Sequence, residues 1–62
     1  MNDTERATLQ STYSGLTFTY NQTVNGITIE SGHVAVKYNG VTNIVEDTVA
    51  AVESFCNDVD GG

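Results

Sequence analysis

The chain has 62 residues, of which 39% are apolar, and it carries 8 Asp and Glu against 2 Lys and Arg, a formal net charge of −6. A chain this short forms one small domain that buries only about 60% of the surface its unfolded state exposes, so an elaborate buried active site has little room. The acid content is ordinary, and the negative charge comes from the scarcity of Lys and Arg. Nucleic acid and anionic membranes are disfavoured as direct ligands, because both require a cationic footprint.

Targeting signals and metal or disulfide patterns are also missing. No apolar run approaches the roughly 20 residues that cross a bilayer, and the N-terminus lacks a signal-peptide pattern, so we expect a soluble, cytoplasmic protein. The single cysteine, Cys56, has no partner for an internal disulfide, and with one histidine it does not complete a zinc site. We therefore expect no cofactor.

The first dozen residues are compatible with a helix or with a strand. Residues 4–12 contain good helix formers, whereas Leu9 and its neighbours also suit a strand. Asn2 and Glu5 have the spacing of a helix cap, and Gly15 follows at a place where a helix could stop. We predict a short helix over residues 4–12.

The middle of the chain has the alternation of apolar and polar side chains that is typical of half-buried strands. Asn25-Gly26 is a strong signal for a two-residue type I′ hairpin turn, and Ser31-Gly32 marks a second turn. We therefore predict a three-stranded antiparallel meander with strands at residues 15–24, 27–31 and 33–38.

The two turns also predict a register. They place Val24 opposite Ile27 and Ile29 opposite Val34, so the apolar residues of all three strands share one face. The same register places Ile27 opposite Val36. A one-residue slip would destroy this agreement.

The last third of the chain favours a helix over a further strand. A hairpin at Asn39-Gly40 would put Asn43 opposite Val36 in the apolar row. Asn43 and Glu46 instead have the spacing of a capping box, and Asp47 in a first turn would suit the helix dipole. We predict an amphipathic helix over residues 44–58, packed on one face of the sheet, and a frayed tail at 59–62. Its apolar side comprises Ile44, Val45, Val49, Val52, Phe55, Cys56 and Val59.

These elements make one domain, residues 1–62, of the α+β class. Within it, Glu30 and His33 flank a tight turn, and such a pair can orient a general base. The same pair is an ordinary cross-strand stabiliser, and no nucleophile accompanies it, so we do not expect an enzyme. Cys56 falls on the apolar side of the helix and should be buried and inert. The acidic tail matches only the first half of a calcium loop, so we expect no metal site.

The acidic C-terminal segment is the remaining candidate for function, because residues 46–62 contain no Lys or Arg. One interpretation is a solvated face that keeps the protein soluble. The other is a negative surface that docks on a basic surface of another protein or nucleoprotein complex. The candidate partner-binding residues, expected to be exposed, are Glu46, Asp47, Glu53, Asp58 and Asp60, with Glu30 on another face.

In size, charge and architecture, the whole chain resembles the small acidic phage-encoded inhibitors of the anti-CRISPR type. The resemblance implies a non-enzymatic inhibitor, monomeric or weakly dimeric, in the cytoplasm of a bacterial host. It would dock on a nucleic-acid-processing complex, such as a CRISPR effector, and hinder access of DNA. The alternative is a self-associating structural or accessory subunit that uses the sheet face or edge. Adaptation to high salt is a third explanation of the acidity.

Overall fold

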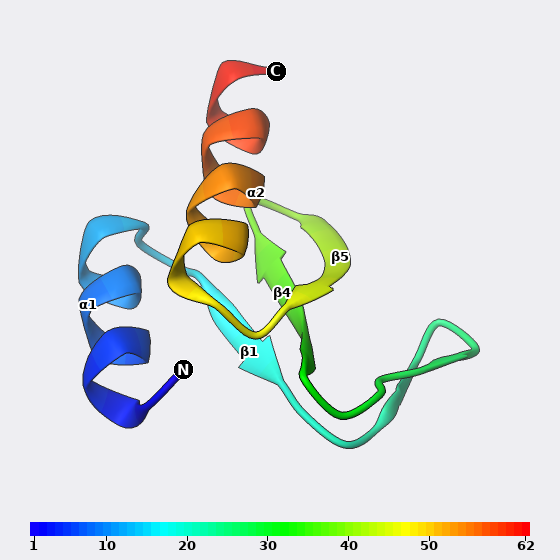
Figure 1. The fold of residues 1–62 in the computed structure, drawn as a ribbon. Coiled ribbons are helices and arrows are strands. Elements are labelled where there is room, and N and C mark those ends of the chain that lie inside the picture. Colours follow the sequence, from blue (N-terminus) through cyan, green and yellow to red (C-terminus); the bar gives the residue numbers. More distant parts are fainter.

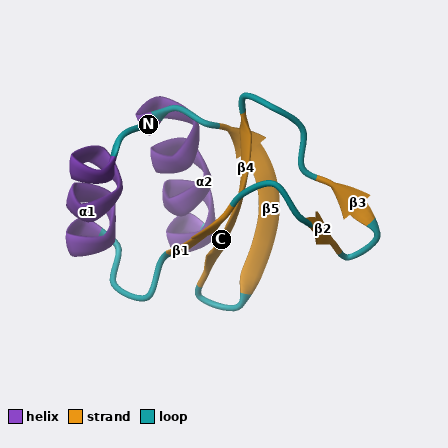
Figure 2. Ribbon diagram, turned by 90° about the horizontal axis from the view of Figure 1, so that it is seen from below, coloured by secondary structure: helices purple, strands orange, loops and turns teal.

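The structure, a computed structural model, describes all residues 1–62. In chain order the elements are α1 (Asp3–Thr12), β1 (Thr17–Thr19), β2 (Thr23–Val24), β3 (Ile27–Thr28), β4 (His33–Tyr38), β5 (Val41–Glu46) and α2 (Val49–Gly61). The main sheet has three antiparallel strands in the order β1-β4-β5, and β2 and β3 form a separate hairpin. Both helices lie on one face of the main sheet, and the β2–β3 hairpin projects from the molecule on the β5 side (Figure 1 and Figure 2). The predicted α+β class, with a three-stranded sheet and a C-terminal helix on one face, is confirmed.

Helix α1 begins with the predicted cap. The Oδ1 atom of Asn2 accepts the Glu5 N–H at 2.8 Å, and Glu5 Oε1 accepts the Asn2 N–H at 3.0 Å, which completes a capping box. The helix ends at Thr12, and Gly15 in the following turn has φ +86°. The predicted N-terminal helix is therefore confirmed, and Leu9 is its buried residue.

The Asn25-Gly26 turn forms as predicted, with φ angles of +52° and +80°, and it pairs Val24 with Ile27. The second turn also forms, because the His33 N–H donates to the Glu30 carbonyl at 3.1 Å. The β2–β3 ladder is much shorter than predicted, however, and contains two residue pairs.

Strand β4 does not pair with β3. Its neighbours are β1, where Phe18 lies opposite Val36, and β5, where Val45 lies opposite Val34. The predicted pairs of Ile29 with Val34 and of Ile27 with Val36 are therefore wrong. Alternation determines which face a side chain takes but not which strand lies beside it, and β1 and β5 satisfy the same alternation.

Residues 41–46 form strand β5, and the predicted helix start at residue 44 is wrong. Asn39-Gly40 adopts φ angles of +55° and +81°, and the resulting hairpin places Asn43 opposite Val36. A polar residue is tolerated in this row because β5 is an edge strand and Asn43 is exposed. The β-branched residues that surround Asn43 favour extended backbone over helix.

Helix α2 begins later and ends later than predicted. Its N-cap is Thr48, whose Oγ1 accepts the Ala51 N–H at 3.2 Å, rather than Asn43. The helix continues to Gly61, and the Gly62 N–H donates to the Asp58 carbonyl at 2.9 Å. The segment 59–62 is therefore largely helical and not a frayed tail.

The core lies between the two helices and the main sheet. Cys56 is completely buried there, as predicted, and burial raises the pKa of its thiol. Val49 and Val59 of the predicted apolar side of the helix pack against this core, and Val45 contacts it from β5. The buried members are Leu9, Leu16, Val34, Val36, Val52, Phe55 and Cys56.

Candidate functional site

Asp47 is a structural residue, and the prediction that it is exposed is wrong. It lies half-buried in the bend between β5 and α2. Its Oδ1 atom accepts the Tyr20 hydroxyl at 2.9 Å and lies 3.2 Å from the Met1 amine. Its backbone N–H donates to the Gly32 carbonyl at 2.9 Å. This carboxylate is therefore engaged inside the molecule and is not available to a partner.

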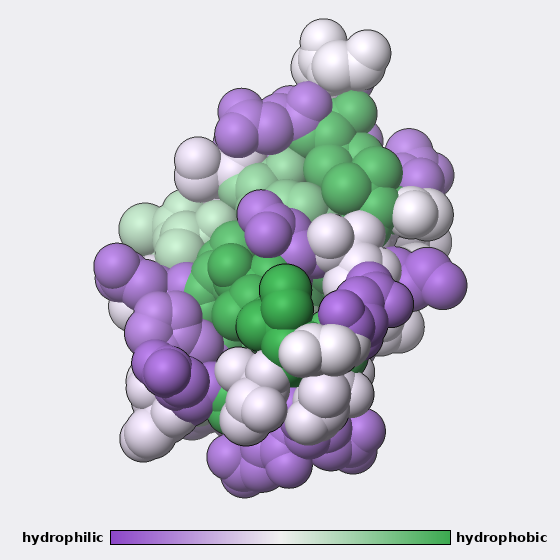
Figure 3. Space-filling view, turned by 90° about the vertical axis from the view of Figure 1, so that its right-hand side faces the viewer, coloured by the Kyte–Doolittle hydropathy of each residue, from purple (hydrophilic) through white to green (hydrophobic).

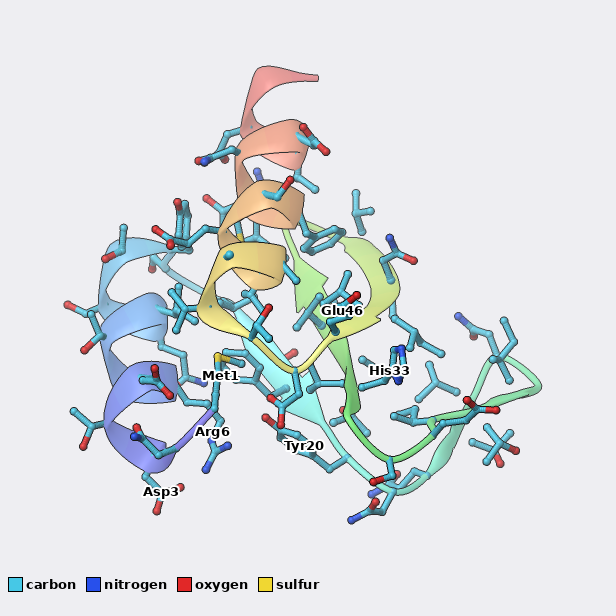
Figure 4. The ribbon with its side chains drawn as sticks, viewed as in Figure 1. Met1, Asp3, Arg6, Tyr20, His33 and Glu46 are labelled. Carbon is cyan, nitrogen blue, oxygen red and sulfur yellow. The ribbon has the colours of Figure 1, made fainter.

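Arg6 extends the same network, and Figure 4 shows its side chain near the labelled Met1, Asp3 and Tyr20. Its Nη1 atom donates to the Tyr20 hydroxyl at 3.1 Å and to the Met1 carbonyl at 3.0 Å, and its guanidinium group forms an ion pair with Asp3. The hydrogen bonds to Asp3 and Tyr20 raise the pKa of Arg6, and burial raises the pKa of Tyr20. Lys37 is therefore the one Lys or Arg side chain without an ion pair.

The other predicted binding residues are exposed carboxylates without an ion pair. They do not share one surface. Glu46 lies at the end of β5 beside His33 (Figure 4), not on the acidic helix where it was predicted. On α2, Glu53 and Asp60 share one side, whereas Asp58 is turned by about 140° from Glu53 at 100° per residue. These residues are Glu30, Glu46, Glu53, Asp58 and Asp60.

Two tyrosines lie beside the surface of α2 that carries Glu53 and Asp60. The ring centroids of Tyr13 and Tyr38 are 5.7 Å apart in an edge-to-face arrangement. The Tyr38 hydroxyl donates to Asp60 Oδ1 at 2.8 Å, and the Tyr13 hydroxyl donates to Asn57 Oδ1 at 3.0 Å. The hydrogen bond with Asp60 raises the pKa of Tyr38, and burial raises the pKa of Tyr13. Aromatic rings next to carboxylates suit a Lys or Arg side chain, because both attract a cation.

Sequence patterns alone do not single out Tyr13 and Tyr38 as site residues. One signal was present, because Tyr38 falls in an apolar row where its hydroxyl group needs a polar partner. That partner is Asp60, which is 22 residues away in a segment that was predicted to be a frayed tail. Only the position of α2 over the end of β4 brings these residues together.

Glu30 and His33 are connected by a backbone hydrogen bond across their turn. The His33 Nδ1 atom lies 3.3 Å from the Ser31 carbonyl oxygen, and the residue opposite His33 in the ladder is Glu46. No hydrogen bond or ion pair joins the Glu30 and His33 side chains. The imidazole is therefore held by a backbone carbonyl and not oriented by a carboxylate.

A groove of about 440 Å³ lies between the β2–β3 hairpin and strand β5. Figure 3 faces this side of the molecule and shows apolar surface bordered by polar side chains. Ile27 in the hairpin is 60% exposed, and Val41 at the start of β5 is 46% exposed. The lining residues are Val24, Asn25, Ile27, Thr28, Glu30, His33, Thr42, Asn43 and Ile44.

No three His, Cys, Asp or Glu residues lie close enough together to hold a metal ion. None of the helices combines the length and the apolar character that a membrane span requires. Comparison with protein-family models, curated proteins and solved structures finds no match to the chain.

Proposed function

We propose that this chain is a non-enzymatic, protein-binding inhibitor of the anti-CRISPR type. It docks its acidic surface on a basic patch of a nucleic-acid-processing effector complex and hinders access of DNA. The observation that supports this function is the imbalance of free charges. Five exposed carboxylates have no ion pair, whereas Lys37 is the one Lys or Arg side chain without an ion pair. The five carboxylates are those of Glu30, Glu46, Glu53, Asp58 and Asp60. Such a field accelerates encounter with a basic partner and orients it.

The centre of the proposed binding surface is the group formed by Tyr13, Tyr38, Glu53 and Asp60. Interfaces concentrate their binding energy in a few residues, and tyrosine is enriched among them. Tyr38 and Asp60 are already joined by a hydrogen bond of 2.8 Å, so this part of the surface is ordered before binding. Asp58, Glu46 and Glu30 lie on other parts of the surface and add to the overall negative field.

The first test is capture of partners from a bacterial lysate with the tagged protein at low and high salt. The captured complex is then purified, and its binding to DNA is measured with and without the chain. We expect capture at low salt, loss of capture at high salt, and inhibition of DNA binding. A captured complex whose DNA binding is unaffected by saturating protein would contradict the proposal.

A pair of charge-matched variants tests the surface itself. Glu53→Gln with Asp60→Asn raises the net charge by two, and so does Thr4→Lys with Thr8→Lys on the exposed side of α1. We expect the α2 variant to weaken inhibition by at least about tenfold and the α1 variant to have a much smaller effect. Equal losses would show that only overall charge matters.

Self-association is a second candidate function, favoured by the unpaired edge of β5 and the exposed Ile27 and Val41. The sign of the salt effect separates the two functions. Two copies of net charge −6 repel each other, so added salt should promote self-association and weaken docking on a basic partner. Sedimentation equilibrium at low and high salt measures this difference.

A further inference from the structure

The outer edge of β5 offers backbone groups that no strand pairs. In an antiparallel ladder, alternate residues direct their N–H and C=O groups away from the neighbouring strand. Ile44 is one of these residues, because its N–H donates to the side-chain Oδ1 of Asn43 at 2.9 Å. Glu46 is another, because its carbonyl accepts the Thr48 N–H at 2.8 Å outside the sheet. The unpaired stretch of the edge is therefore centred on Thr42 and Ile44.

Asn43 occupies the position that a neighbouring strand would take. Its amide oxygen supplies to the Ile44 N–H the kind of acceptor that the carbonyl of an added strand would supply. Asn43 is exposed, and its side chain can turn away without opening the core. An incoming strand therefore replaces the Asn43 side chain as the acceptor of the Ile44 N–H, and it gains new hydrogen bonds at Thr42.

The groove beside this edge can receive a side chain of such a strand. Thr42, Asn43 and Ile44 all line it. Consecutive residues of a strand point to opposite faces, so a groove that touches all three runs along the edge of the sheet. Ile27 and Ile44 provide apolar walls, and the exposed carboxylates of Glu30 and Glu46 lie near one end.

We propose that an extended segment of a basic partner adds to the β5 edge. It places an apolar side chain in the groove and Lys or Arg side chains near Glu30 and Glu46. Main-chain hydrogen bonds then supply affinity, and the groove supplies specificity. A second copy of this chain is a poorer occupant, because its β5 carries Glu46 and no cation, and both copies have a net charge of −6. The inference rests on the proposed function and names the strand and groove that a basic partner would use.

The test uses a capped ten-residue peptide in which lysine alternates with valine, titrated into the 15N-labelled protein. The control is the same peptide with alternate amides N-methylated, which keeps charge and side chains but does not pair as a strand. We expect the first peptide to shift the amide signals of Thr42, Ile44 and Ile27, and the control to bind at least about tenfold more weakly. Equal affinity of the two peptides, or absence of binding, overturns the inference.

A substitution in the protein should change its affinity for the peptide in a defined direction. Asn43→Ala removes the internal competitor for the Ile44 N–H, so the peptide should bind about threefold to tenfold more tightly. Thr12→Ala on α1 also removes one side-chain hydrogen bond, from Thr12 Oγ1 to the Thr8 carbonyl, and should leave the affinity unchanged. Weaker binding to the Asn43→Ala protein contradicts the exchange of acceptors.

The location of the shifts separates this inference from the proposed function. If the peptide shifts signals around Glu53 and Asp60 and leaves β5 unchanged, the edge inference fails, while docking of a basic partner on the acidic surface stands. If the β5 signals shift but the intact chain does not inhibit its captured complex, the proposed function fails on its own assay. Concentration-dependent shifts of β5 in the absence of peptide would identify a second copy as the occupant and would also overturn the inference.

Discussion

Replacement of Asp47 by Ala should destabilise the fold far more than the same replacement at the adjacent Glu46. Asp47 accepts a hydrogen bond of 2.9 Å from Tyr20 and lies 3.2 Å from the Met1 amine, whereas Glu46 is exposed and has no ion pair. Both substitutions remove one negative charge and shorten one acidic side chain. The difference between them therefore measures the internal contacts of Asp47.

The expected magnitude follows from those contacts. A hydrogen bond to a charged group contributes about 1.5–3 kcal/mol, and a partly exposed ion pair adds at most about 1 kcal/mol. Asp47→Ala should therefore lower the free energy of unfolding by about 2–3 kcal/mol, while Glu46→Ala should change it by less than about 0.5 kcal/mol. In a domain of this size the larger loss corresponds to a fall in Tm of about 15 °C.

Urea unfolding, followed by circular dichroism, measures both variants. The midpoint of Asp47→Ala should fall with an unchanged slope, because the surface exposed on unfolding stays the same. Tyr20→Phe removes one partner of Asp47, and the double variant should lose less than the sum of the single losses. If Asp47→Ala is no less stable than Glu46→Ala, Asp47 is not a structural residue and returns to the candidate binding surface.

Two further predictions concern alkaline pH and the β4–β5 turn. Burial raises the pKa of Cys56 above its ordinary 9.0, and the Asp60 hydrogen bond raises that of Tyr38 above 10.0. As the pH rises, the unfolded chain then loses these protons before the folded chain does. The urea midpoint should therefore stay constant up to about pH 9 and fall at higher pH; a midpoint at about pH 10.5 that equals the midpoint at about pH 9 would contradict this prediction. Gly40→Ala should cost about 1 kcal/mol, because Ala is strained at φ +81° although nothing lies within 4 Å. Gly26→Ala has a similar φ of +80° and should cost less, because the two-pair hairpin it closes can fray; equal losses of Tm would argue against a strand at 41–46.

Local signals in the sequence were sufficient to predict the structure wherever a contact between neighbouring residues determines it. The Asn2–Glu5 cap and the Asn25-Gly26 turn involve residues close in sequence, and both form as predicted. The register of the main sheet depends instead on residues far apart in the sequence, because β1 pairs with β4 across the intervening β2–β3 hairpin. Apolar alternation is shared by every strand of the chain, so it determines faces without identifying neighbours.

The boundary between β5 and α2 shows how two local signals can compete. Asn43 and Glu46 have the spacing of a capping box, but Thr48 also has a side chain that caps a helix, and it is the residue used. The Asn39-Gly40 turn decides between them, because both residues adopt positive φ and return the chain beside β4. The one polar residue that argued against this hairpin, Asn43, lies on an edge strand, where burial is incomplete.

This change of boundary alters the site more than it alters the fold. A helix from residue 44 would gather the acids of the last third of the chain on a single element. Because the helix begins after Thr48, Glu46 lies at the end of β5 beside His33, and Asp47 turns inward to Tyr20. Composition alone therefore overstates the number of free carboxylates on the surface, since the acids that cap α1, pair with Arg6 or bind Tyr20 are engaged within the fold. Two separate exposed surfaces remain, one where Asp60 adjoins the tyrosine pair and one along the open edge of β5.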